Sequence, residues 1–175
     1  FICSFEPDEP IDLIFAVAEA LAAEDLTAVI TGDLSRALSH AEVPRHPRIL
    51  LPGFVPRPVY EAILMGASVV VVLSKDTDCL MCGAYEAIAA ERPLVLSNTP
   101  LLRTVFGGCA TYAPNDLMPI LDAIQARIGG LGPDFAYGKR AFQSSFLEEW
   151  QAFLRVLGPV LGCTLPAEAG SQRSE

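Results

Sequence analysis

Short runs of apolar residues alternate along the chain with segments whose apolar residues recur every three or four positions. The short runs predict β-strands, and several are apolar at successive positions. That pattern is typical of parallel strands whose two faces are both covered by helices. The predicted strands are residues 2–5, 27–31, 48–51, 69–73, 94–97 and 109–112.

Segments with helical spacing fill most of the intervals between these runs. Asp8 is a candidate cap for the first helix and Asn115 for a later one, because short polar side chains accept hydrogen bonds from free helix amides. Residues 34–44 have the weakest pattern and are expected to hold only a short helix. The predicted helices are residues 11–21, 58–66, 83–90, 100–106, 117–128 and 136–157.

The last predicted helix carries a stripe of aromatic and aliphatic residues at steps of four, four, three and four. Because such a stripe normally packs into a core, we expect Trp150 to be a core residue rather than a ligand contact. The stripe consists of Phe142, Phe146, Trp150, Phe153 and Leu157.

Alternation of strands and helices predicts an α/β fold, Rossmann-like and doubly wound, with a mainly parallel six-stranded sheet and helices on both faces. Residues 1–163 are expected to form this one domain, and the small, polar residues 164–175 a disordered tail. Ligands of such sheets bind beyond the carboxyl ends of the strands. The residues that follow the strands are therefore the ones to inspect for chemistry.

Composition narrows the possible partners and the compartment. The net charge of −9 argues against nucleic acid, which normally binds to a basic patch. Five cysteines without a framework spacing favour a reducing, cytoplasmic setting. No apolar run is long enough to span a membrane, and no signal-peptide pattern is present. Because the chain starts with Phe1 inside a predicted strand, we expect it to be part of a longer protein.

The loop after the most apolar strand, residues 74–86, contains the best candidates for binding. Backbone amides of residues 80–84 would lie at a helix N-terminus, where oriented N–H groups and the helix dipole attract anions. Glu86, about one turn into the helix, is placed to accept hydrogen bonds from a diol such as ribose. Asp78 precedes the turn and could accept from the hydroxyls of a second sugar.

Asp78 and Glu86 lie eight positions apart and are followed by Ala87-Ile-Ala-Ala-Glu-Arg-Pro-Leu-Val-Leu-Ser97. This segment resembles the E-x7-E motif, and the "EAMAAGKPVV" segment after it, of the retaining GT-B glycosyltransferases of family four and its relatives. Other segments match the family in the same order: 30–33, 49–55, 101–108 and 112–116. The resemblance covers roughly residues 1–128, which correspond to the C-terminal, donor-binding domain of that family.

The resemblance implies a role for each matching residue. Glu86 would hold the nucleotide ribose and Asp78 the hydroxyls of the donor sugar, and these two would be the catalytic acids. The remaining candidates bind the donor: the sugar and phosphates would approach Cys79, Leu80, Met81, Cys82 and Gly83, and the base would lie near Gly53, Phe54 and Val55. Lys75, in the same loop, is a further donor-binding candidate, which does not come from the family pattern.

The donor implied by this resemblance is a nucleotide diphosphate sugar of the UDP, GDP or ADP type, with no other cofactor and no metal. The family further implies retention of anomeric configuration and a role in bacterial polysaccharide biosynthesis. The acceptor would bind to an N-terminal domain that these 175 residues do not include. The fragment alone is therefore expected to be inactive, and the whole protein to be cytoplasmic or peripheral at the inner membrane.

The sequence also departs from the family. Asp78 is one methylene shorter than the usual Glu, and Cys79-Leu80-Met81 replaces the usual Gly-Phe-Gly. The first strand–helix loop, residues 4–10, lacks the usual Arg and Lys and carries three carboxylates, which would repel a diphosphate. Either another cation replaces them, or the donor or the activity differs. The candidate cations are Lys75, Arg57 and Arg103.

Three other functions remain open on the sequence. A degenerate, non-catalytic GT-B module that scaffolds a partner would explain the missing basic pair. A nucleotide-sugar epimerase shares the architecture but normally has histidine and acidic catalytic residues that are not evident here, and His40 and His46 fall in a predicted loop. A redox protein is the third, because a helix N-terminus would lower the thiol pKa of the Cys79–Cys82 pair.

Overall fold

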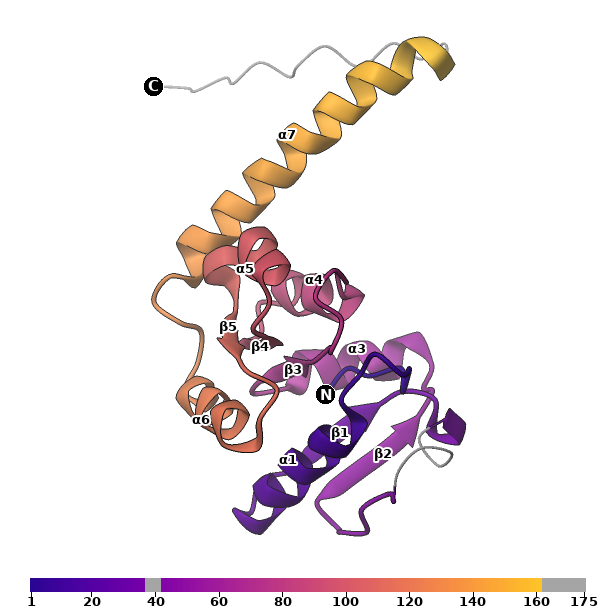
Figure 1. Ribbon diagram of the computed structural model, residues 1–175, viewed down its shortest axis with the longest axis vertical. Coiled ribbons are helices and arrows are strands. Elements are labelled where there is room, and N and C mark those ends of the chain that lie inside the picture. The colour runs from indigo at the N-terminus through magenta and orange to yellow at the C-terminus, as the bar shows by residue number, and fades with distance from the viewer. Residues whose placement is uncertain (37–41, 162–175) are drawn as a thin grey trace. The chain divides into compact units, whose positions relative to one another are not determined.

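The computed structural model describes residues 1–36 and 42–161, with side chains to residue 156. The chain divides into two compact units, Phe1–Lys139 and Arg140–Glu175. All strands of the described residues belong to the first unit (Figure 1). Over the part of the chain described, no helix combines the length and apolar character needed to cross a membrane.

Two small parallel sheets form the centre of the first unit. β1 (Ala28–Thr31) pairs with β2 (Ile49–Gly53), and β4 (Leu94–Ser97) lies between β3 (Val70–Val72) and β5 (Thr111–Ala113). Every residue of β3 and β4 is buried, as expected for strands covered on both faces. The predicted parallel α/β fold is confirmed.

The first residues of the chain join these two sheets. Ile2 forms a parallel bridge with Thr31, and the Thr31 amide donates to the Phe1 carbonyl at 3.1 Å. On the other side, the Ile2 amide donates to the Val71 carbonyl at 3.1 Å. These bonds put the first segment between β1 and β3. The chain therefore builds outward in one direction through β1 and β2 and in the other through β3, β4 and β5.

The prediction of six strands in one sheet is wrong. The described residues form five strands in two sheets, and the expected strand at residues 2–5 is reduced to the single bridge at Ile2. The backbone leaves the strand conformation at Phe5, whose φ is +59°. The amides of Ser4 and Glu6 donate to the Glu9 carboxylate, so they are not available to a neighbouring strand.

The helices begin and end close to the predicted residues. Residues 34–36 are helical, and 37–41, part of the predicted short helix, lie outside the described residues. The helices are α1 (Ile11–Ala23), α3 (Arg57–Gly66), α4 (Cys82–Ala89), α5 (Pro100–Phe106), α6 (Leu117–Ile128) and α7 (Phe135–Leu161).

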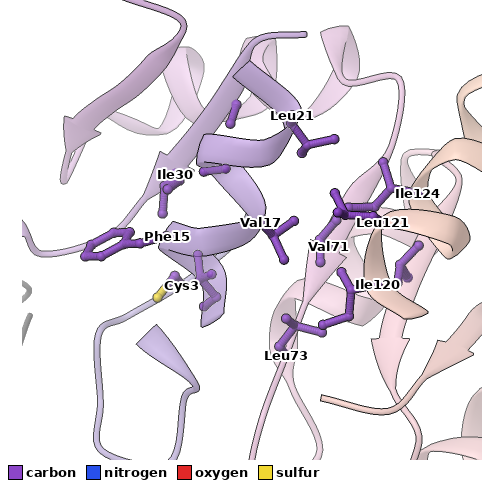
Figure 2. Close-up of a cluster of buried hydrophobic side chains, with 14 of the residues drawn as sticks. Cys3, Phe15, Val17, Leu21, Ile30, Val71, Leu73, Ile120, Leu121 and Ile124 are labelled. Carbon is purple, nitrogen blue, oxygen red and sulfur yellow. The ribbon is translucent and has the colours of Figure 1, made fainter. Parts of the chain in front are cut away.

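The core lies on both sides of the strands. α1 and α6 pack together on one side, where Val17 and Leu21 face Val71, Ile120 and Ile124 (Figure 2). Figure 1 shows α3, α4 and α5 on the other side. Burial of these aliphatic side chains, each worth about 1.5–3 kcal/mol when complete, holds the strand ends in fixed positions.

Two predicted helix caps are wrong. The residue preceding α1 is Pro10, and no side chain caps this helix, because the Asp8 carboxylate instead accepts from the Ser74 hydroxyl. The residue preceding α6 is Asp116, and the side chain of Asn115 is engaged with Ser97 and Ser74. In both cases, long-range bonds between loops replace the local cap.

The predicted core stripe of the last helix is not buried. Phe146, Trp150 and Phe153 are each about half exposed, and Trp150 stacks on Phe153 with ring centroids 5.6 Å apart. Leu157 lies outside the residues whose side chains are described. In the second unit, the part of α7 from Arg140 onward has no strand or further helix among the described residues on which to bury this face.

Candidate functional site

A cavity of about 620 Å³ lies at the carboxyl ends of the strands, where the order of the sheet reverses. Its walls come from the first segment and the ends of β1 and β2, with Tyr60 from α3 and Glu86 from α4. Open α/β sheets bind their ligands at such a reversal, because the loops on its two sides diverge and leave a crevice. The cavity is therefore the candidate site.

Glu86 and Tyr60 meet at the wall of this cavity. Tyr60 lies one turn into α3, and its hydroxyl donates to Glu86 Oε2 across 26 residues of sequence. Glu86 is exposed, whereas Tyr60 is partly buried. Burial and the hydrogen bond to Glu86 raise the pKa of Tyr60, so the phenol remains a proton donor. The Glu86 carboxylate is thus held at the cavity by a neutral donor.

The loop after β2 forms the outer wall. Gly53 has a φ of +73°, a conformation that favours glycine and turns the chain toward the cavity. The Phe54 side chain is 92% exposed, an unusual position for a large aromatic group. Gly53, Phe54 and Val55 therefore form an open apolar rim beside Glu86.

Two arginines line the same cavity, and both have acidic partners. Arg57 Nε donates to Glu61 at 2.7 Å, and this bond, with a smaller contribution from the charge of Glu86, raises the pKa of Arg57. Arg36 forms a salt bridge with Glu6. Arg36 also lies 3.8 Å from Asp33. Because the Arg57 side chain is 87% exposed and that of Arg36 is half exposed, these ion pairs are weak and open to exchange for another anion.

Each of the three carboxylates of the first loop has a partner within the chain. The Glu9 carboxylate accepts from the amides of Ser4 and Glu6 at 3.0 Å and from the Cys3 thiol at 3.1 Å. Burial and the nearby Glu9 charge raise the pKa of Cys3. Glu6 pairs with Arg36, and Asp8 accepts from Ser74. The amides of Ser4 and Glu6 are therefore already occupied by an anion that belongs to the chain.

The loop after β3 is fixed by a network of polar groups, of which two serines are buried and an asparagine is partly buried. The Ser97 hydroxyl accepts from the Ser74 amide at 2.9 Å and donates to Asn115 Oδ1 at 2.7 Å, while Asn115 Nδ2 donates to the Ser74 carbonyl at 2.8 Å. Ser74 and Ser97 are each 1% exposed. The carboxyl ends of β3, β4 and β5 are thereby linked to one another.

The residues that continue this loop are turned outward. Lys75 and Asp78 are exposed and do not line the cavity; the Asp78 amide donates to Asp76 Oδ1 at 2.8 Å. α4 then starts at Cys82. Ala84, predicted to have a free amide, donates to the Met81 carbonyl at 3.0 Å.

Gly83, predicted to bind the donor, packs against Ile2 in the first segment. It is buried, and a Cβ placed there would come within 2.9 Å of Ile2 Cγ2. A glycine is needed for the first turn of α4 to approach the segment between the two sheets this closely. This contact brings Glu86 over the junction of the sheets.

The thiol of Cys79 does not gain the activation that the sequence predicts. Burial, with the charges of Asp8 and Asp76 as smaller causes, raises the pKa of Cys79, whereas a redox cysteine has a lowered one. The prediction that the helix N-terminus lowers the Cys79 pKa is therefore wrong.

Four predicted site residues share the cavity: Gly53, Phe54, Val55 and Glu86. The other candidates do not line it: Lys75, Asp78, Cys79, Leu80, Met81, Cys82 and Gly83. Tyr60 and Arg36 line the cavity but were not predicted from the sequence. Tyr60 had a usable signal, since it follows Phe54 and Val55 in the first turn of the next helix, on the side that faces the strand ends.

No family model and no curated protein sequence matches the chain. Solved structures of glycosyltransferases with the GT-B fold do match. TarM of S. aureus, in a complex that contains UDP, has a TM-score of 0.61 at 20% sequence identity. The match covers 86% of this chain and 34% of the TarM chain. The pneumococcal O-GlcNAc transferase GtfA, in complex with UDP and GlcNAc, has a TM-score of 0.58 at 19% sequence identity. That match covers 89% of this chain and 35% of the GtfA chain.

A glycosyltransferase from Rickettsia africae gives a TM-score of 0.66 at 13% identity and covers 91% of this chain and 47% of its own. The chain thus spans between about a third and a half of the length of these proteins. Likeness at such low identity establishes the fold, since one fold can support many activities. It establishes a Rossmann-like α/β fold shared with one part of GT-B glycosyltransferases.

Proposed function

We propose that this chain is the donor-binding part of a glycosyltransferase that moves a sugar from a nucleotide diphosphate sugar to an acceptor. The proposal depends most on one observation: the Glu86 carboxylate and the open rim at Gly53–Val55 lie on one cavity at the reversal of the sheet. A carboxylate beside an aromatic rim suits a nucleoside, whose ribose diol donates hydrogen bonds and whose base is flat and apolar on both faces.

In this proposal, the nucleoside occupies the cavity with its base near Phe54 and its ribose at Glu86. The diphosphate points to the N-terminus of α4, near Leu80, Met81 and Cys82, where the helix dipole stabilises the departing phosphate groups. Asp78 and Cys79 then lie on the sugar side, and Asp78 accepts from sugar hydroxyls. Retention of configuration belongs to the same proposal.

A positive charge is needed near the diphosphate, since the first loop has none. Arg57 and Arg36 are the cations of the described residues that line the cavity. Their acidic partners include Glu61 at Arg57 and Glu6 and Asp33 at Arg36, and these three side chains are each about half exposed. We assign Arg57 the larger part, because it is closer in sequence to the rim and feels the charge of Glu86. Lys75 completes the set from the loop after β3.

The acceptor site and the rest of the cleft would come from another domain of the protein, so the chain by itself would bind the donor without transferring sugar. UDP, GDP and ADP forms of the donor all remain candidates. We place the whole protein in the bacterial cytoplasm or at the inner face of the membrane, in polysaccharide synthesis.

The test is the melting temperature of the chain with UDP, GDP and ADP at millimolar concentration. A ligand present at a hundred times its Kd stabilises the folded state by about 2.7 kcal/mol, so one of the three nucleotides should raise the Tm by several degrees. The Glu86→Gln variant should lose most of this shift. Glu149→Gln, which changes an exposed carboxylate on α7, should retain it. Absence of a shift with all three nucleotides would overturn the proposal.

A second candidate is a non-catalytic module of the same fold, and the first loop favours it. Glu9 occupies the amides that would otherwise be free to bind a phosphate oxygen. If this occupation is permanent, the chain should bind nucleosides and nucleoside diphosphates equally well. A donor domain should prefer the diphosphate at least tenfold, so comparison of uridine with UDP separates the two functions.

A further inference from the structure

Tyr60 lies between two cavities of different character. On one side is the cavity that contains Glu86 and the rim at Gly53–Val55. On the other is a mainly apolar cavity of about 490 Å³, lined by aliphatic residues of β1, α3, β3 and α6. Tyr60 belongs to the walls of both, and its hydroxyl donates to Glu86. The residue thus borders a mainly apolar cavity, and its hydroxyl meets a carboxylate that lines the open site.

The carboxylate at the other end of this bond is otherwise free to move. Glu86 is exposed on α4, and a glutamate side chain loses much rotamer freedom when it is fixed. Of the residues whose side chains the structure describes, only Tyr60 donates a hydrogen bond to it. One oxygen, Oε2, is therefore fixed by the protein, which leaves Oε1 for a donor outside the chain.

We propose that Tyr60 is a positioning residue that fixes the Glu86 carboxylate for a vicinal diol, such as that of ribose, in the cavity. This inference rests on the proposed function, and it concerns a residue that the sequence did not predict. The phenol fixes the carboxylate before the ligand arrives, so binding does not have to order that side chain. The hydrogen bond also makes Oε2 a poorer acceptor than Oε1, so the diol bonds mainly to Oε1.

A purely structural role for Tyr60 makes a different prediction. If the ring only fills space between the two cavities, removal of its hydroxyl should have little effect, and removal of the ring should weaken every ligand alike. If the hydroxyl positions Glu86, its removal should weaken only ligands that carry a diol. Tyr60→Phe keeps the ring and removes the hydroxyl, which makes it the informative change.

The experiment measures Kd by calorimetry for wild type, Tyr60→Phe, Glu86→Gln and the double variant. The probes are the tightest binder among UDP, GDP and ADP and the 2′,3′-dideoxy form of the same nucleotide. Tyr60→Phe should weaken the ribonucleotide about two- to tenfold, the range expected for loss of one prearranged side chain, and leave the dideoxy form unchanged. In the Glu86→Gln background, Tyr60→Phe should have no further effect, because the two residues act as one unit.

Equal weakening of both nucleotides, no change in either, or additive effects of the two substitutions would each overturn the inference and leave the proposed function standing. Failure of wild type to bind any of the three ribonucleotides would overturn the proposed function and this inference together. The melting temperature of Tyr60→Phe, measured without ligand, controls for loss of fold. Tyr137→Phe, at a tyrosine that is 74% exposed on α7, is the matched control for loss of a phenol hydroxyl.

Discussion

The carboxyl ends of the strands differ between the two sheets in whether their polar groups bond to one another. On the β3–β5 side, Ser74, Ser97 and Asn115 bond to one another, and the serines are almost completely buried. On the β1–β2 side, Phe54 is left in solvent and Glu86 presents a carboxylate to a cavity. We call the β3–β5 side the closed half, because its polar groups bond to one another, and the β1–β2 side the open half, because a cavity lies at its strand ends.

The difference separates scaffold from candidate site. A polar group whose partners all come from the chain stabilises the fold, whereas an exposed aromatic ring and a singly bonded carboxylate contribute little to it. The closed half fixes the position of α4, and the open half uses that position to present Glu86. Substitutions in the closed half should therefore change stability, and substitutions in the open half should change binding.

The largest effect is expected in the closed half. Asn115→Ala removes the acceptor of the Ser97 hydroxyl and the donor to the Ser74 carbonyl, both at buried residues. The free energy of unfolding should fall by about 1–3 kcal/mol, measured by urea denaturation. Asn98→Ala is the control, since Asn98 is exposed and its side chain accepts from an exposed arginine, and it should change the free energy by less than about 0.5 kcal/mol. Equal losses for the two variants would contradict the comparison.

A smaller effect, and of another kind, is expected in the open half. Phe54→Ala removes a side chain that is 92% exposed, so the free energy of unfolding should stay within about 0.5 kcal/mol of wild type. If a base stacks on this ring, nucleotide affinity should fall by about 1 kcal/mol, roughly fivefold, as measured by calorimetry. Phe146→Ala, at an exposed aromatic residue of α7, is the control. It should change neither the free energy of unfolding nor the nucleotide affinity by more than about 0.5 kcal/mol. A destabilised Phe54→Ala protein would place Phe54 with the scaffold.

The smallest effect concerns the thiol of Cys79 in the loop after β3. Because burial and nearby carboxylates raise the pKa of Cys79 above its ordinary value of 9.0, the folded protein keeps this thiol protonated where the unfolded chain loses the proton. Stability from this group is therefore complete below that value and declines as the pH rises past it.

Alkylation of Cys79 by iodoacetamide, followed by peptide mass spectrometry, checks the direction of this shift. The reaction should be slower than that of N-acetylcysteine at about pH 8, and its rate should still rise above about pH 9, since only the thiolate reacts. Urea-unfolded protein is the control and should react at the rate of the simple thiol. A folded Cys79 that reacts faster would revive the redox function.

Local patterns predicted most of the fold, because they report backbone preference and burial directly. The buried runs at 70–72 and 94–97 and the helix between them lie where the sequence placed them. What local patterns could not show was competition from distant groups. Asp8 and Asn115 have the composition of helix caps, yet they bond to Ser74 and Ser97 across the sheet.

The candidate site was predicted in the same partial way. Glu86 and Gly53–Val55 were found because a strand ends before each, and strand ends converge in a parallel sheet. Tyr60 was missed, since its role depends on a contact with Glu86 in another helix. The stripe at Phe146 and Trp150 has correct helical spacing, but spacing alone does not supply a surface to pack against.

Backbone continuity between the two sheets depends on very few bonds. Ile2 forms a single bridge to β1, and its amide donates one hydrogen bond to β3. Within each sheet, by contrast, neighbouring strands pair at several successive residues. The amides of Ile2 and Thr31 should thus report local opening by early exchange with D₂O. Both cavities border this junction, so a molecule held in either one bridges the two halves. Occupancy of a cavity by a ligand and rigidity of the first unit are thereby linked. Slower deuterium uptake at the Ile2 amide would therefore report ligand binding without any catalytic turnover.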